Sequence, residues 1–261
     1  MDFFNKTQFK LSGKYNGYSI IFFHGHNHSA FNYNYKYVNG FKRDKSKFLD
    51  YLEHLSTLFI YDRPEEMLRF NVLRGKDTYI KDYYNVLKET SPIWHVKILE
   101  EFLRLKNVKP PYVLIGHGTG CIYALRFANA FKEKTKGIYL MEPYHLNPRT
   151  AMSSLGNKLN NEKLLENLQN LNNETLKKLE AHTIAAPAFP IKFTFPVRCY
   201  FKLKEGDKKL VREQDTFKKY LKDNNPENLK CFTFSDKGGM LNETNPLGLA
   251  YNIKYDIQGR R

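Results

Sequence analysis

The sequence predicts an α/β protein, a three-layer α/β/α sandwich around a mainly parallel, doubly wound sheet. Short apolar, β-favouring runs alternate along the chain with segments whose apolar residues recur at helical spacing. Strands that alternate with helices form βαβ units, and their right-handed crossovers place helices on both faces of one sheet. The length of 261 residues fits one such domain, or one domain with an insertion.

The elements follow in chain order. Strands are expected at residues 18–23, 57–61, 112–115, 137–141, 196–203 and 229–234, and helices at 45–55, 91–105 and 121–131. The second helix opens at Ser91-Pro92, because proline is tolerated in a first turn, and Pro110-Pro111 follows it. Four residues come directly after strands and should gather at one edge of the sheet, where sites of such folds form: His24, Asp62, Gly116 and Glu142.

One segment interrupts the alternation. Residues 147–191 separate the fourth expected strand from the fifth, and within them Leu164, Leu168 and Leu171 are spaced for an amphipathic helix. We expect one domain over residues 1–261 that carries a small helical lid, or cap, at 147–191. An ordinary crossover helix with long loops is the alternative.

The most informative turn follows the third expected strand. Residues 112–115 lead into Gly116-His117-Gly118-Thr119-Gly120, and a helix-forming run begins at once. This is the strand–turn–helix context of the G-x-S-x-G nucleophile elbow. Both flanking glycines are present, but the central position, Gly118, has no side chain.

These motifs resemble the α/β-hydrolase superfamily of lipases and esterases over about residues 17–250. Residues 20–25 are similar to the strand that leads to the oxyanion-hole loop, and residues 61–64 to a strand-end turn of the family, although the glycines of that turn are absent. The elbow and the insertion follow in the family's order. The resemblance implies an oxyanion hole and pocket formed by His24, Gly25, His26, His117 and Thr119.

The resemblance also locates the other two catalytic positions. Residues 204–211 are similar to the turn in which an aspartate orients the histidine, so Asp207 is the retained acid candidate and Glu142 the second. Without a histidine to hold, either carboxylate is expected to be a solvated surface group. The histidine position falls on Gly239, and no histidine follows His182.

A serine hydrolase needs an activated hydroxyl and a base, and Gly118 and Gly239 supply neither. We therefore interpret the chain as a catalytically inactive pseudo-hydrolase with a binding or structural role. Glycine also avoids the steric strain of the elbow backbone. The alternative is a hydrolase of carboxylic esters or acyl lipids that uses a displaced catalytic set. Cys121 is expected in the core rather than as that nucleophile.

Several histidines are expected near the elbow, and His24, His26, His28 and His117 are the candidate metal ligands. His24 and His117 are accounted for by the ordinary family pattern, and His26 and His28 alternate in direction if the chain is extended. The sequence therefore predicts no metal and no cofactor.

The chain is basic, with a formal net charge of +15. Such a charge favours nucleic acid or another anionic surface, but the basic residues are dispersed and not interleaved with aromatics, which favours a solubilising surface. Other partner classes left open are a protein or larger assembly, and a small apolar or acyl ligand in the residual pocket.

Location is inferred from what the sequence carries. It contains no signal peptide and no transmembrane run, and its three cysteines lie in apolar segments, so we expect a cytoplasmic or intracellular protein with buried, reduced thiols. Abundant Lys, Asn, Tyr and Phe are typical of an A+T-rich genome, of a virus among others, which leaves a virion component open.

Overall fold

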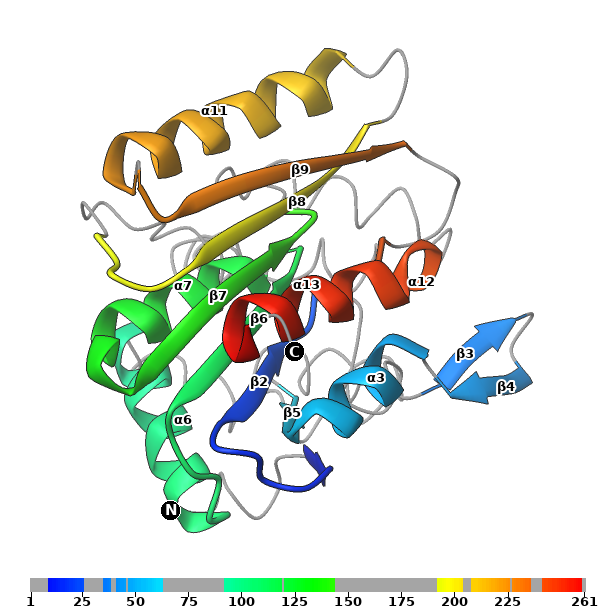
Figure 1. The fold of residues 1–261 in the computed structure, drawn as a ribbon, viewed down its shortest axis with the longest axis vertical. Coiled ribbons are helices and arrows are strands. Elements are labelled where there is room, and N and C mark those ends of the chain that lie inside the picture. Colours follow the sequence, from blue (N-terminus) through cyan, green and yellow to red (C-terminus); the bar gives the residue numbers. More distant parts are fainter. Residues whose placement is uncertain are drawn as a thin grey trace, which may run out of the picture.

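The protein is built on a mainly parallel sheet (Figure 1). The computed structural model describes residues 9–25, 35–38, 41–45, 47–62, 92–118, 120–143, 192–203, 208–225, 227–235 and 241–259. Within them the seven-stranded sheet has the order β1-β5-β2-β6-β7-β8-β9. Its strands are β1 (Phe9–Ser12), β2 (Ser19–Phe23), β5 (Thr57–Tyr61), β6 (Tyr112–His117), β7 (Thr135–Met141), β8 (Val197–Leu203) and β9 (Leu229–Ser235).

All neighbouring strands of this sheet are parallel except β1, which pairs antiparallel with β5. A separate antiparallel hairpin consists of β3 (Tyr35–Val38) and β4 (Phe41–Lys45), and it projects from the body beside α3 in Figure 1.

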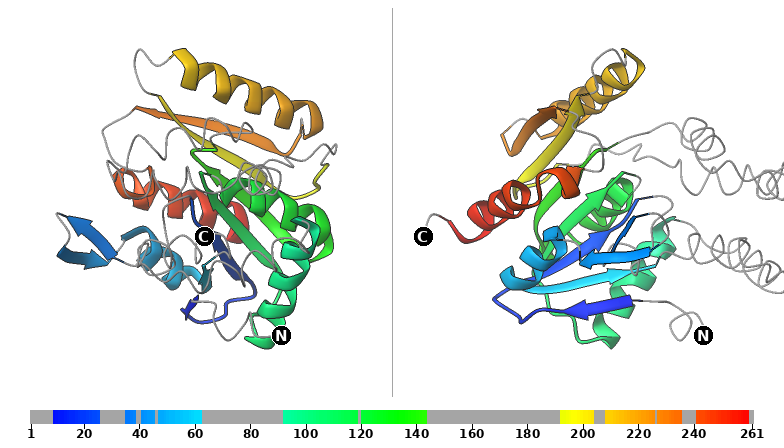
Figure 2. Two further views of the ribbon diagram at one scale, coloured as in Figure 1. Left: turned by 180° about the vertical axis from the view of Figure 1, so that it is seen from behind. Right: turned by 90° about the vertical axis from the view of Figure 1, so that its right-hand side faces the viewer.

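Helices cover both faces of the sheet, which makes the three layers visible when the molecule is turned edge-on (Figure 2, right). Buried residues of α6 (Pro92–Leu105), α7 (Gly120–Ala130) and α11 (Lys208–Asn224) belong to one core cluster, and those of α3 (Lys47–Leu55) and α13 (Pro246–Gln258) to the other. The short α12 (Leu241–Thr244) precedes α13, and a single 3₁₀ turn (Lys132–Lys134) follows α7. The predicted three-layer α/β class is therefore confirmed.

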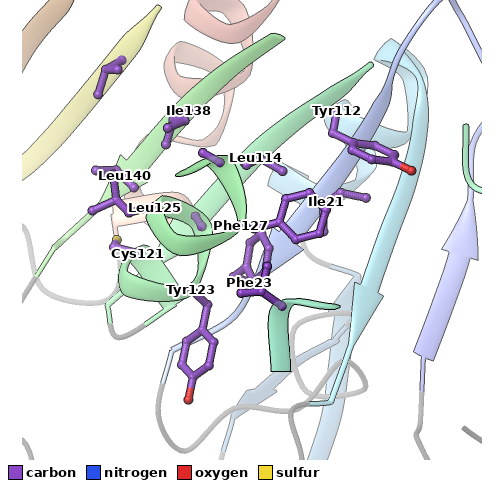
Figure 3. Packing of buried hydrophobic residues seen from close by; sticks show 14 of the residues in the cluster. Ile21, Phe23, Tyr112, Leu114, Cys121, Tyr123, Leu125, Phe127, Ile138 and Leu140 are labelled. Carbon is purple, nitrogen blue, oxygen red and sulfur yellow. The ribbon is translucent and has the colours of Figure 1, made fainter. Parts of the chain in front are cut away.

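Helix α7 packs closely onto the centre of the sheet (Figure 3). The ring of Phe127 lies 6.2 Å from that of Phe23 on β2 and 5.8 Å, edge to face, from that of Tyr112 on β6. The small residues Ala124 and Ala128 are completely buried on the same helix. Because these residues bury the helix against three strands, they hold the turn that precedes it in a defined place.

The expected strands are all present, with ends that differ by one or two residues, and residues 57–61 agree throughout. Strand β1, the hairpin, α11 and α13 were not predicted from the sequence. The expectation of three buried thiols is wrong, because Cys231 is exposed. Its strand, β9, lies at the end of the strand order, so within the described residues a neighbouring strand covers only one of its sides. The predicted lid, 147–191, lies outside the described residues.

No helix in the described part of the chain has the length and apolar character needed to cross a bilayer.

Candidate active site at the elbow after strand β6

Four parallel strands end at one edge of the sheet and bring the predicted rim residues together. The side chain of His24, after β2, has its Nε2 3.5 Å from Oδ1 of Asp62, which follows β5. The backbone N–H of Gly118, after β6, donates to the carbonyl of Met141 at the end of β7, at 2.9 Å. The edge is therefore continuous from β5 to β7, as the parallel register requires.

The described part of the turn is a tight connection between β6 and α7, as the elbow prediction requires. Gly118 has φ of +55°, in the left-handed region, and its carbonyl accepts from the N–H of Cys121 at 3.1 Å. A Cβ atom on Gly116 would lie 2.5 Å from the Cα of Cys121, and one on Gly120 would lie 2.0 Å from the carbonyl oxygen of Phe23. The two flanking glycines are thus required by close packing of helix, turn and strand.

The central glycine differs from its neighbours. Among the described residues, a Cβ on Gly118 would meet only the Cα of Gly25, at 3.7 Å, which is ordinary van der Waals contact. The space that a catalytic side chain would enter is therefore not filled by the described backbone. The positive φ of Gly118 disfavours a side chain at this position, whereas contacts with the described residues do not exclude one.

The second acid candidate, Glu142, is buried and firmly held. Its Oε2 lies 2.7 Å from Nε2 of His117, which donates to it, and its Oε1 accepts from the backbone N–H of Leu241 at 3.2 Å. Its own N–H donates to the carbonyl of Tyr200 at 2.8 Å, and its φ is +46°. The expectation of a solvated surface carboxylate is wrong for Glu142, since it is only 4% exposed.

Its histidine partner was not identified from the sequence. His117 lies immediately before Gly118, whereas the family resemblance predicts the catalytic histidine after the last strand. The ring of His117 is buried between Glu142 and Gly25. A Cβ added to Gly25 would lie 3.1 Å from Nδ1 of His117. The only signal in the sequence was the position of both residues directly at strand ends, which parallel pairing of β6 with β7 makes adjacent.

His24 is completely buried, and its Nδ1 lies 3.0 Å from the carbonyl oxygen of Gly25. An added Cβ on Gly25 would lie 3.1 Å from Nδ1 of His117, so the loop that the resemblance assigns to the oxyanion hole lies against the predicted elbow at Gly25. The pocket roles predicted for His24, Gly25 and His117 stay predictions.

Cys121 lies in the core, as expected, and not as a nucleophile. Its Sγ donates to the carbonyls of Gly116, at 3.2 Å, and Met141, at 3.4 Å. Burial, with a smaller contribution from the nearby Glu142 carboxylate, raises the pKa of its thiol well above the ordinary value. The reactive thiolate is therefore suppressed at this position.

Five of the predicted site residues lie outside the described residues: Thr119, His26, His28, Asp207 and Gly239. Leu241, two residues beyond Gly239, nevertheless donates to Glu142, so the chain that follows the predicted histidine position reaches the acid at the elbow. Within the described ranges no three His, Cys, Asp or Glu side chains are grouped to hold a metal.

Known proteins resemble this chain in structure but not in sequence. No protein-family model matches the chain, and no curated protein sequence is similar to it. Three solved structures illustrate the structural similarity. An α/β-hydrolase enzyme from the metagenome of sediments of the lagoon of Mar Chica, Morocco, is 16% identical with a TM-score of 0.59, over 95% of this chain and 93% of that one.

The other two structures are similar over comparable lengths. A probable hydrolytic enzyme from Pseudomonas aeruginosa PAO1 is 12% identical with a TM-score of 0.58, over 98% of this chain and 89% of that one. Alpha/beta hydrolase domain-containing protein 10 from mouse is 15% identical with a TM-score of 0.57, over 95% and 92% of the two chains. At such identities the likeness concerns the fold.

Proposed function

We propose that this chain, which has the α/β-hydrolase fold, is catalytically inactive and acts by binding or as a structural component. The observation that carries the proposal is Gly118 at the centre of an otherwise preserved elbow, with φ of +55°. Covalent ester hydrolysis needs a hydroxyl or thiolate at that point. A residue without a side chain offers neither.

Among the described residues, the groups near the elbow do not offer a replacement for the missing nucleophile. The Cys121 thiol is buried, kept protonated and directed at two backbone carbonyls. The Glu142 carboxylate accepts from His117 and from the Leu241 backbone, so both of its oxygens are engaged within the protein. The pair supports the proposal, because it makes the acid at this edge a structural acceptor.

The open space at Gly118 supports a binding role for the same site. Among the described residues only Gly25 lies within 4 Å of an added Cβ, and we propose that part of a ligand occupies this position, where a serine would stand. We propose a small apolar or acyl molecule as the ligand class, in keeping with the resemblance of these motifs to lipases and esterases. A protein partner or an anionic surface, favoured by the charge of +15, is the other class.

Fluorophosphonate labelling tests the absence of a nucleophile. The purified chain should remain unmodified, as should the G118A variant. The double variant G118S/G239H restores both missing groups and should be labelled, because Leu241 brings the chain beyond Gly239 to the acid. Stoichiometric labelling of the unaltered chain would refute the proposal.

One observation favours a second function, hydrolysis of esters or acyl lipids by a displaced set. The buried His117–Glu142 pair, 2.7 Å apart, stands beside the elbow and resembles the oriented base of a hydrolase. If it activates water, ester hydrolysis by the purified chain should fall on the order of 10²-fold in E142Q, a typical loss for a general base. The G118A variant should hydrolyse at the unaltered rate. Hydrolysis that is no faster than in buffer excludes this function.

A further inference from the structure

Two cysteines lie side by side on the last two strands of the sheet. Cys199 on β8 is the register partner of Cys231 on β9, and the strands are parallel. Neighbouring strands lie about 4.7–4.9 Å apart. That spacing falls inside the range of about 4.4–6.8 Å between Cα atoms that a disulfide accepts. A bond between the two sulfur atoms therefore needs no large movement of the backbone.

The two thiols differ in access. Cys199 is completely buried in the core beneath α11, whereas Cys231 is exposed on the edge strand. A reagent in solution can therefore reach Cys231, whereas the neighbouring Cys199 is shielded from solvent. This division of access is the arrangement of a reacting thiol and a resolving thiol.

The thiols also differ in proton affinity, and their contacts explain why. A hydrogen bond from the Cys199 thiol, helped by the Lys218 ammonium, lowers the pKa of Cys231 to about 7. Burial and the same hydrogen bond raise the pKa of Cys199 well above its ordinary value. The Lys218 Nζ lies 4.7 Å from the ring centroid of Phe201, two residues beyond Cys199 on β8, which places the ammonium over this face.

We propose that Cys199 and Cys231 form a redox-active dithiol that a hydroperoxide closes into a disulfide between β8 and β9. The Cys231 thiolate attacks the peroxide, an S–O bond forms as the O–O bond breaks, and the departing alkoxide or hydroxide takes up from solvent the proton that the thiol released on ionisation. Cys231 is thereby oxidised by two electrons to the sulfenic acid, and the peroxide is reduced to an alcohol or water.

The second step is condensation. The Cys199 sulfur attacks the sulfenic sulfur, the S–S bond forms as the S–O bond breaks, and the Cys199 proton leaves with hydroxide as water. A small thiol reductant restores both cysteines by exchange. This site is independent of the elbow, so its test does not depend on whether the chain is a hydrolase.

The experiment exposes the reduced, full chain to hydrogen peroxide, alkylates it after denaturation and maps the peptides. The chain has three cysteines, and we expect alkylation of Cys121 only, with one peptide pair joined through Cys199 and Cys231. The C199S variant should instead trap a dimedone adduct at Cys231. The C121S variant, which changes the other buried thiol, should oxidise like the unaltered chain.

A second readout does not require a variant. Iodoacetamide should modify Cys231 with a midpoint near pH 7, and at that pH its thiolate population exceeds that of an ordinary thiol of pKa about 8.5 on the order of tenfold. K218M should move the midpoint upward. The proposal is overturned if Cys231 reacts no faster than Cys121, or if peroxide takes Cys231 to the sulfonic acid while Cys199 stays free.

Discussion

Replacing Gly118 with serine restores the side chain that the elbow lacks, and the structure predicts what this costs in stability. The backbone φ of +55° lies in the left-handed region, where an L side chain costs roughly 1–2 kcal/mol. No close contact with the described residues adds to this cost, because among them the new Cβ would meet only the Cα of Gly25, at 3.7 Å. We therefore expect G118S to lower the free energy of unfolding by about 1–2 kcal/mol.

The flanking glycine gives the matched contrast. A Cβ on Gly116 would lie 2.5 Å from the Cα of Cys121, which is backbone and has no freedom to turn away. G116A should therefore cost more than about 4 kcal/mol or prevent folding, since helix α7 must shift from the sheet. G118A separates the backbone strain from any effect of the serine hydroxyl, and it should match G118S.

Urea denaturation measures both costs through the fluorescence of Trp94, the only tryptophan, which lies on α6. In a thermal scan the loss in G118S corresponds to a fall in melting temperature of about 2–8 °C for a chain of this size. The reasoning fails if G118A destabilises the protein as much as G116A, because the elbow would then have no free space at its centre.

Two further predictions concern buried groups. E142Q keeps the shape of the side chain but weakens its hydrogen bonds to His117 and Leu241. The free energy of unfolding, measured by urea denaturation, should therefore fall by about 1.5–3 kcal/mol. An unchanged urea midpoint would mean that the His117–Glu142 hydrogen bond is not formed. Burial raises the pKa of Tyr112 to about 12 from 10.0, so the protein should lose stability as pH rises from 10 to 12, because the unfolded chain releases the proton first. Y112F should reduce that slope by about 1.4 kcal/mol per pH unit between these limits, and equal slopes in both proteins would contradict the burial.

The sheet could be predicted because its central strands are buried on both faces. Such strands read as short apolar runs, and the run at residues 57–61 coincides with β5. Strand β1 was missed for the opposite reason: Phe9–Ser12 is only half covered and carries no apolar run. Helix α11 was missed because charged residues dominate it, and the described apolar residues that it buries, Phe217 and Leu221, span only one turn of its 17 residues.

The site divides in the same way. The glycine turn at residues 116–120 is a local pattern. Gly116 and Gly120 are required by close contacts with nearby backbone, and Gly118 has a positive φ. The pairing of His117 with Glu142 is not local. The two residues are 25 positions apart and meet only because β6 and β7 run parallel and end together.

The residues of the chain are thus sufficient to predict a glycine at the centre of an elbow-like turn, since the absence of a side chain at Gly118 holds in any conformation. Only the folded arrangement determined that Glu142 is buried against His117, that Cys121 is sealed in the core and that Cys231 faces outward beside Cys199. The physical reason is that the sequence specifies the identity of each side chain directly. The burial, the partners and the protonation of that side chain depend on strands that the sheet brings together.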